Sequence, residues 1–219
     1  MASTHKDETS WRLAAQRLEE GARELGLAAS HATTERLLAY LEIMSRWNRT
    51  FNLTAIRDPE EMVTRHILDS LAVLPHIPAG TLLDVGSGAG LPGIPLALIN
   101  PIRSVTLLDK SHKRVDFLTE VAAQLVLPNV TLVCQRVEDY RPARPFDVVI
   151  ARAFASLHDI VTATDHLLAE HGVLIAMKGA LPTEELAAIG PPFVVRAVHA
   201  MRVPGLAAKR HLLVLARAP

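Results

Sequence analysis

The sequence predicts an α/β fold, in which a mostly parallel sheet ends in an antiparallel C-terminal strand and is preceded by N-terminal helices. Three observations lead to this prediction. From Thr81 onward, short apolar runs alternate with segments of helical periodicity, as expected of strand–helix–strand units. The first run leads directly into a glycine-rich turn. The last two runs, Phe193–Val203 and His211–Ala216, are joined by a link too short for a crossover helix, so they should pair antiparallel.

Helices are expected in the N-terminal part of the chain. Residues 10–28 place apolar side chains at helical spacing, and a second helix is expected from about Thr33 to Trp47. Residues 47–54 show no period and are expected to form an ordered loop. Asp58 as N-cap, with proline at the first helical position, predicts a third helix that ends before Pro75.

Residues 75–80 contain proline and glycine and are expected to hold the domain boundary. Residues 1–78 would then form a helical extension whose first ~10 residues are flexible, and residues 79–219 the α/β domain. Within that domain, strands are expected at Leu82–Gly86, Ser104–Leu108, Val130–Val133, Phe146–Ile150 and Gly172–Lys178, and helices after Gly93, after Ser111, after the fourth strand as far as about Ala169, and from Pro182 to Ile189.

The turn after the first of these strands is the most informative stretch. The pattern G-x-G-x-x-G at Gly88–Gly93 starts too long after the strand for a dinucleotide turn. The glycines nearest the strand are Gly86, Gly88 and Gly90, behind Asp84. A carboxylate facing the ligand would repel a pyrophosphate and attract an ammonium or sulfonium group. The alternative is a tight strand–helix turn without a ligand.

The pattern D-x-G-x-G-x-G after an apolar strand is similar to the first motif of the class I S-adenosylmethionine (AdoMet) methyltransferases. A parallel sheet closed by an antiparallel pair is also the layout of that Rossmann-like fold. The resemblance therefore implies AdoMet as cofactor, with the glycine turn and Leu91 beside it.

Other candidate site residues follow the strands, because ligands of open α/β sheets bind beyond the carboxyl ends of the strands. Asp109, 25 residues after Asp84, has two oxygens to accept the ribose hydroxyls. Val137 and Glu138 are placed to meet the adenine. Arg152 lies on the expected substrate side, in the segment Ala151–Phe154. The alternatives are a helix N-terminal carboxylate for Asp109, a solvated charge for Glu138 and a structural salt bridge for Arg152.

The amino-acid composition limits which classes of function are possible. Lys and Arg number 23, as do Asp and Glu, so the formal net charge is zero and does not indicate a protein that coats nucleic acid. One cysteine, Cys134, rules out an internal disulfide and a cysteine-based metal site. The N-terminus lacks the apolar core of a signal peptide, and no apolar stretch reaches membrane-spanning length. We expect a cytoplasmic monomer without a membrane or metal partner.

Several segments together resemble the bacterial ribosomal RNA small subunit methyltransferase G family, also called GidB. They are Trp47-Asn48, Phe51–Thr54, Arg65–Ser70, Asp84–Gly93, Arg136–Glu138 and Arg152–Ala155. The resemblance implies methylation of guanine N7 in the decoding region of small-subunit (16S) ribosomal RNA. It implies AdoMet contacts at Gly86, Leu91, Val137, Glu138 and Arg152, the last also positioning the transfer.

The remaining motif residues are expected to form the substrate side. Asn48, Phe51, Asn52, Arg65 and His66 precede the cofactor motif and are expected to build the wall of the substrate site. Guanine N7 has no proton to remove, so no general base is expected. Basic residues are candidates for phosphate contacts with the RNA or the small subunit, namely Arg46, Arg49, Arg57, Arg65, Lys110, Lys113, Arg114, Lys178, Lys209 and Arg210.

Two other functions fit the residues. A small-molecule methyltransferase would suit the zero net charge, and a ribosome-assembly factor could bind AdoMet without turnover. A dehydrogenase is disfavoured by Asp84.

Overall fold

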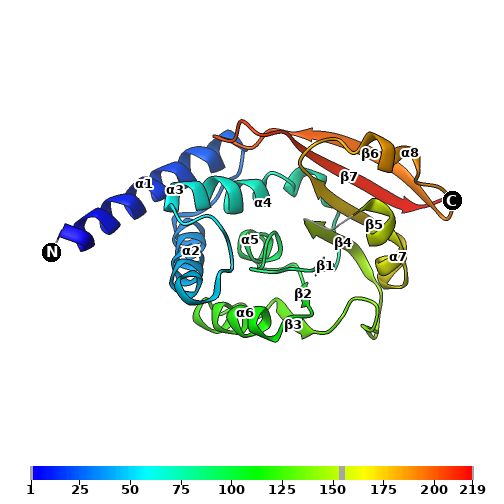
Figure 1. The fold of residues 1–219 in the computed structure, drawn as a ribbon, viewed down its shortest axis with the longest axis horizontal. Coiled ribbons are helices and arrows are strands. Elements are labelled where there is room, and N and C mark those ends of the chain that lie inside the picture. The colour runs from blue at the N-terminus through cyan, green and yellow to red at the C-terminus, as the bar shows by residue number, and fades with distance from the viewer. Residues whose placement is uncertain (1, 153–155, 219) are drawn as a thin grey trace.

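The chain forms a seven-stranded sheet with helices on both faces (Figure 1). The structure is a computed structural model that describes residues 2–152 and 156–218. Residues 153–155, part of the predicted substrate-side segment, lie outside this range. The strands are β1 (Leu82–Val85), β2 (Val105–Asp109), β3 (Val130–Cys134), β4 (Phe146–Arg152), β5 (Leu168–Lys178), β6 (Phe193–Met201) and β7 (Arg210–Arg217).

The strand order is β3-β2-β1-β4-β5-β7-β6. Strands β1 to β5 pair parallel with their neighbours, whereas β7 pairs antiparallel with both β5 and β6. The predicted mostly parallel sheet with an antiparallel C-terminal strand is therefore confirmed. The order reverses beside β1, and this is where an open α/β sheet offers its binding crevice.

The N-terminal helices differ from the predicted bounds: the first begins earlier and ends four residues before residue 28, and the second extends beyond Trp47. They are α1 (Ala2–Glu24), α2 (His31–Phe51), and a continuous helical run of α3 (Pro59–Met62), the π-helix η1 (Val63–Leu68) and α4 (Asp69–Leu71), followed by the 3₁₀ turn η2 (Leu74–His76). The loop predicted from Trp47 is wrong up to Phe51. These two rings, four residues apart, pack with centroids 4.9 Å apart and continue α2, which ends where Asn52 takes a left-handed conformation.

The later helices are short: α5 (Gly93–Ile99), α6 (His112–Gln124), α7 (Leu157–Thr164), the 3₁₀ turn η3 (Asp165–Leu167) and α8 (Thr183–Ala187). The helix expected as far as Ala169 is wrong at its end, because β5 begins at Leu168, which pairs with Phe146. Arg217 of β7 donates to the carbonyls of Asp165, Leu168 and Ala169, and so ties the helix end to the sheet.

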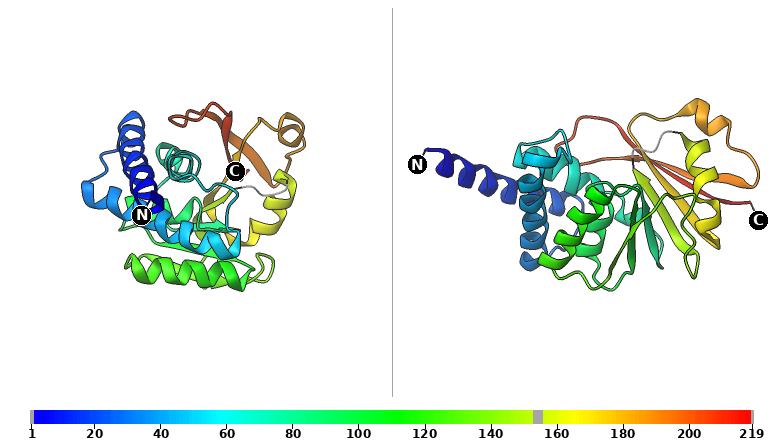
Figure 2. Two further views of the ribbon diagram at one scale, coloured as in Figure 1. Left: turned by 60° about the vertical axis from the view of Figure 1, so that its left-hand side comes forward. Right: turned by 60° about the horizontal axis from the view of Figure 1, so that its bottom comes forward.

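Alternating side chains of the strands divide the core into two layers. Leu82, Ile150 and Leu212 pack under the N-terminal helices, α5 and α6, whereas Leu83 and Val149 face α7. Figure 2 shows α2 beside α6 on the first face and α7 on the other. By the same alternation, the side chains of Asp84 and Arg152 lie on the face that the N-terminal helices cover.

The hydrophobic core crosses the predicted domain boundary. One cluster of buried side chains joins Leu18 and Leu41 of the N-terminal helices with Ile94 of α5 and Phe117 of α6. The division into residues 1–78 and 79–219, with its flexible first residues, stays a prediction. The shared cluster indicates that both parts unfold together.

This shared core predicts one cooperative unfolding transition. Both tryptophans, Trp11 and Trp47, lie in the N-terminal helices, so their fluorescence reports on that part, whereas far-UV circular dichroism reports on the whole chain. In urea the two curves should coincide. Leu41→Ala, at a fully buried site, should lower the free energy of unfolding by about 2 to 5 kcal/mol and shift both curves equally.

The control is Leu13→Ala, at a position that is 40% exposed, which should leave both curves in place. A tryptophan transition at clearly lower urea than the dichroism transition would contradict the shared core.

Candidate functional site

The glycine turn lies at the carboxyl end of β1, beside the switch in strand order. Gly86, Gly88 and Gly90 all have positive φ, at 67°, 58° and 85°. A Cβ on Gly86 would meet no atom within 4 Å, so this glycine borders open space and is needed for its backbone conformation. A Cβ on Gly93 would lie 2.2 Å from Leu107, so that glycine is needed for close packing of α5 on the sheet.

Six backbone amides in and beside this turn are bonded within the protein. Gly86 N and Ser87 N donate to the Leu108 carbonyl at 2.8 and 3.1 Å, and Gly90 N and Leu91 N donate to the Ser87 carbonyl. Gly88 N donates to Asp109 Oδ2, and Gly93 N donates to Asp84 Oδ2, both at 2.8 Å. A pyrophosphate would need these donors free. The turn therefore lacks the open amide cradle of a dinucleotide site.

Asp84 lies beneath the turn, 1% exposed. Its Oδ1 has no hydrogen-bond partner among the described residues. Burial raises the pKa of Asp84 to about 7, against the lowering effects of the Gly93 amide and the positive charge of Arg152. The sequence analysis expected this carboxylate to face the ligand. In the structure, Asp84 Oδ2 accepts a hydrogen bond from Gly93 N at the start of α5. A direct contact between Asp84 and a cationic ligand stays a prediction.

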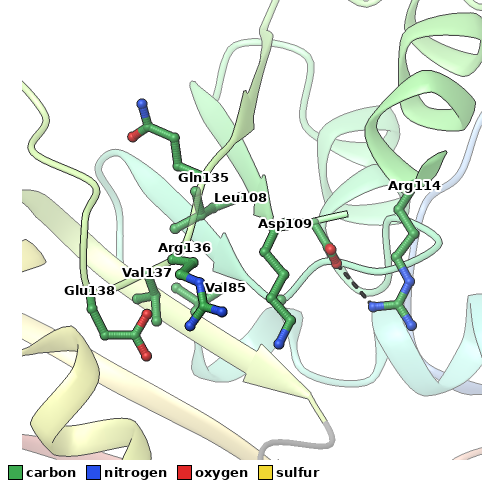
Figure 3. Close-up of a pocket in the computed structure, with 10 residues that line it drawn as sticks. Val85, Leu108, Asp109, Arg114, Gln135, Arg136, Val137 and Glu138 are labelled. Carbon is green, nitrogen blue, oxygen red and sulfur yellow. Dashed lines mark hydrogen bonds and ion pairs between the residues drawn. The ribbon is translucent and has the colours of Figure 1, made fainter. Parts of the chain in front are cut away.

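A pocket of about 180 Å³ opens at the ends of β1, β2 and β3, and we call it the strand-end pocket (Figure 3). Its apolar surface comes from Val85, Leu108 and Val137, and apolar side chains of this kind can pack against the flat face of a base. The polar residues around it are Asp109, Lys110, Arg114, Gln135, Arg136 and Glu138. Glu138, an exposed residue, stands on the side of the pocket away from Asp109 and Arg114.

Asp109 is already engaged by protein groups. Its Oδ1 accepts from Ser111 N at 2.9 Å, ahead of α6, and its Oδ2 accepts from Gly88 N and from Arg114 Nη1 at 3.2 Å. The expected ribose contact stays a prediction. To accept hydrogen bonds from both ribose hydroxyls, the Asp109 carboxylate would have to release Arg114, whose side chain is half exposed.

A second pocket of about 280 Å³ lies on the other side of the turn, and we call it the glycine-turn pocket. It shares Gly86 and Arg114 with the strand-end pocket, so the two pockets are adjacent across the turn. Its other lining residues are Leu53, Thr54, His66, Ser87, Gly88, Ala89, Leu91 and Arg152. The N-terminal motif residues Leu53, Thr54 and His66 thus form one wall, and the turn forms the opposite wall.

The wall is held by hydrogen bonds within the N-terminal motif. Asn48, which is buried, accepts from Thr54 N at 2.9 Å and so shapes the loop after α2. Thr54 Oγ1 accepts from Ile56 N and contacts His66 Nε2 at 3.0 Å. Burial, together with the charge of Arg152, lowers the pKa of His66 to about 4. His66 is therefore neutral near pH 7 and offers a polar contact rather than a charge.

Arg152 reaches the glycine-turn pocket from the end of β4 and forms an ion pair. Its Nη1 lies 3.3 Å from Asp69 Oδ2 and donates to the Arg65 carbonyl at 3.4 Å. The structural salt bridge that the sequence left as an alternative is present. The side chain is still 25% accessible and lines the pocket, so the ion pair and a ligand contact are compatible.

The predicted phosphate-binding residues are distributed over several places: Lys110 and Arg114 line the strand-end pocket, and Arg49 and Arg57 line another pocket beside Asn48. Lys178 pairs with Glu185 at 3.2 Å. Its neighbour Met177 faces the N-terminal helices, so the side chain of Lys178 lies on the other face of the sheet. Arg210 pairs with Asp69 at 2.8 Å.

Asn52, Arg65 and Lys209 are exposed, and Arg65 lies 3.8 Å from Glu61. The other exposed candidates are Arg46, Arg49, Arg57, Lys110, Lys113 and Arg114. Their RNA contacts stay predictions.

Two residues of the site had no assigned role in the sequence analysis. Tyr40 of α2 is fully buried and donates to the Ala89 carbonyl at 2.5 Å, which ties the glycine turn to the N-terminal helices. Asp69 was noted only as part of a motif. No sequence signal indicates Tyr40, because it has the helical spacing of an ordinary core residue. Asp69 could have been suspected as a carboxylate within an apolar helical stretch.

Among the described residues, no group of three or more His, Cys, Asp or Glu side chains is arranged to hold a metal ion. Nor does any helix in the described part combine the length and apolarity that crossing a membrane requires.

The raised pKa of Asp84 predicts a pH-dependent stability. The unfolded carboxyl ionises near 3.8 and the folded one near 7, so between these values folding loses stability as the pH rises. From pH 5 to pH 8 the free energy of unfolding should fall by about 2 to 3 kcal/mol relative to Asp84→Asn, at about 1.4 kcal/mol per pH unit. Urea denaturation of both proteins measures this difference.

The exposed carboxylate of Asp116 on α6 supplies the control, and Asp116→Asn should keep the pH dependence of the wild type. Identical pH profiles for the wild type and Asp84→Asn would contradict the raised pKa.

The chain is similar to known proteins both in structure and in sequence. Among solved structures, the chain is similar to a ribosomal protein L11 methylase from Lactobacillus delbrueckii subsp. bulgaricus, with a TM-score of 0.54, 20% identity and coverage of 76% of this chain and 90% of that one. It is also similar to the glycopeptide N-methyltransferase MtfA in complex with AdoMet, with a TM-score of 0.57, 14% identity and coverage of 70% and 87%. These likenesses confirm the class I methyltransferase fold.

Relatives in sequence are much closer. The chain is 50% identical over 200 residues to a ribosomal RNA small subunit methyltransferase G from Methylobacillus flagellatus, covering 91% of this chain and 97% of the relative. A protein of the same name from Pseudomonas paraeruginosa is 50% identical over 204 residues, covering 93% and 95%. The family model of GidB, rRNA small subunit methyltransferase G, matches residues 33–213. The chain therefore belongs to the rRNA small subunit methyltransferase G family.

Proposed function

We propose that this protein transfers the methyl group of AdoMet to N7 of a guanine in 16S ribosomal RNA. The observation that carries the proposal is the pair of adjacent pockets at the glycine turn, one on each side of Gly86. The strand-end pocket suits an adenosine, and the glycine-turn pocket leaves room for the methionine end and an incoming base. Membership of the methyltransferase G family supports the substrate.

The turn favours a cationic ligand over an anionic one. Its amides donate to Asp84, Asp109 and backbone carbonyls, so none of these donors is left to hold a pyrophosphate. Oxygen atoms of carboxylates and carbonyls surround the turn and favour a sulfonium electrostatically. The engaged amides and the surrounding oxygens thus favour AdoMet over a dinucleotide cofactor, independently of the glycine pattern.

The residues have distinct proposed roles. The turn and Leu91 border the cofactor, Val137 and Glu138 meet the adenine, and Asp109 accepts from the ribose. Arg152 positions the methionine end and the base. His66 and the loop held by Asn48 form the substrate wall, while exposed Arg65 and Lys209, together with Asn52, contact the RNA.

The proposed reaction requires alignment rather than proton transfer. Guanine N7 is an acceptor without a proton, and its lone pair attacks the methyl carbon while the bond from that carbon to sulfur breaks. The guanine gains the positive charge that the sulfonium loses. A neutral His66 and an Arg152 held by Asp69 can orient the base without removing a proton. Aligned reactants can account for about 7 to 11 kcal/mol of the barrier.

We further propose that the protein acts as a monomer in the cytoplasm, where its RNA substrate is found.

Ligand choice gives the first test of this function. AdoMet should bind in a calorimetric titration and NAD should not. Gly86→Val should raise the Kd for AdoMet by about tenfold or more, since a β-branched residue is strained at a φ of 67° and its side chain would enter the space between the two pockets.

The matched control is Gly190→Val, because a Cβ at Gly190 also meets no atom within 4 Å but its φ is not positive. It should bind AdoMet like the wild type. NAD binding comparable to that of AdoMet would rule out the proposed cofactor.

Methyl transfer itself gives the second test. Small-subunit ribosomal RNA or the small subunit, incubated with tritiated AdoMet in EDTA, should yield N7-methylguanosine in nucleoside mass spectrometry. The single-turnover rate of Asp84→Asn should be flat between pH 6 and pH 8.5, since this change removes the group with a pKa of about 7, His66 is already neutral there and no base titrates in the transfer step.

Methylation of a ribose or a carbon atom, or a need for a metal ion, would contradict the proposed chemistry. Binding of AdoMet without any transfer would favour an assembly factor instead.

A further inference from the structure

Asp69 occupies a central position, as a buried carboxylate between two arginines. It is the first residue of α4 and its side chain is only 5% accessible. Oδ2 lies 3.3 Å from Arg152 Nη1, and Oδ1 accepts from Arg210 Nε at 2.8 Å. One buried carboxylate thus links β4 and β7, which are not neighbours in the sheet, through a helix that lies over both.

The fold explains why these three residues meet. Arg152 comes two residues after Ile150 on β4, and Arg210 comes two residues before Leu212 on β7. Residues two apart in a strand share a face, so both arginine side chains lie on the face covered by the N-terminal helices. The π-helix Val63–Leu68 comes immediately before Asp69. Such wide turns change the direction of the following side chains and occur often at functional sites. The Arg65 carbonyl of this π-helix accepts a second hydrogen bond from Arg152.

Arg152 depends on this contact for its orientation. Its side chain is 25% accessible and lines the glycine-turn pocket beside His66 and Gly86. Without the carboxylate, a guanidinium on a long side chain would have several rotamers and would be close to a second unpaired guanidinium, Arg210. A charge-assisted pair with a buried acceptor restricts both the position and the plane of the group.

We propose that Asp69 is a positioning residue for methyl transfer: it fixes the Arg152 guanidinium at the glycine-turn pocket, and Arg210 holds Asp69 from the other side. This inference rests on the proposed function. It assigns Arg210 a role in the site's internal support, whereas the sequence suggested a phosphate contact.

The test is a double-mutant cycle. Asp69→Asn should lower kcat for transfer to small-subunit RNA by about 10- to 100-fold, the loss expected when a positioned group is displaced by about 1 Å. The Kd for AdoMet should rise at least threefold. Both effects should disappear in an Arg152→Gln background, so that the double variant is no worse than Arg152→Gln alone.

Asp165→Asn is the matched control. Asp165 also pairs with an arginine, Arg217, at 2.8 Å, but this pair lies at the opposite end of the sheet from the pockets. This variant should keep the kcat and the AdoMet affinity of the wild type. Urea denaturation of every variant confirms that the assays report on folded protein.

Additive losses in the cycle, or a wild-type kcat in Asp69→Asn, would overturn the inference. If Asp69→Asn does not fold, Asp69→Glu takes its place in the same cycle, because it keeps the charge but displaces the guanidinium by one methylene. The AdoMet arm needs no RNA. Absence of transfer by the wild type would refute the proposed function alone, whereas unchanged AdoMet affinity in Asp69→Asn would refute the positioning role.

Discussion

The contact on which the site depends is the hydrogen bond from Gly93 N to the buried carboxylate of Asp84. It joins the end of β1 to the start of α5 and closes the glycine turn from below. Asp109 closes the same turn from the side of β2 through Gly88 N. Two carboxylates therefore occupy the donors that an anionic ligand would need, and the turn offers its open face to a cation.

The N-terminal helices complete this arrangement. Tyr40 donates to the Ala89 carbonyl and so fixes the far side of the turn. The bonds from Thr54 N to Asn48 and between Thr54 and His66 build the facing wall. Burial leaves His66 neutral at pH 7 and raises the pKa of Asp84 to about 7. Two cations line the glycine-turn pocket: Arg114, which pairs with Asp109, and Arg152, whose charge also acts on His66 and Asp84. The position of the Arg152 charge is set by Asp69, which belongs to the N-terminal part of the chain.

The fold could be predicted from the sequence because its signals are local. Apolar runs, the glycine turn and the short link before β7 each determine an element, and their order determines the sheet. The end of α2 was misplaced because the polar stretch around Asn48 hides a helical pair, Trp47 and Phe51. Asn48 is buried as an acceptor for Thr54 N, a contact that composition does not indicate.

Long-range polar contacts could not be predicted. The partner of Arg210 is 141 residues away, and neither residue carries a local sign of the pair. Lys178 is different: it alternates with Met177 on β5, so strand periodicity alone places it on the face away from Arg152. Sequence reasoning located the strand ends where ligands bind, but the pairing of charges at those ends depends on tertiary structure.

A crystal structure of the protein with AdoMet would test the central claim most directly. The account predicts the adenine in the strand-end pocket between Leu108 and Val137, the sulfonium beside Gly86, and the methyl group directed into the glycine-turn pocket toward His66 and Arg152. The bonds from Gly88 N to Asp109 and from Gly93 N to Asp84 should remain in place. A cofactor bound elsewhere, or turn amides released from these carboxylates to hold an anionic group, would contradict it.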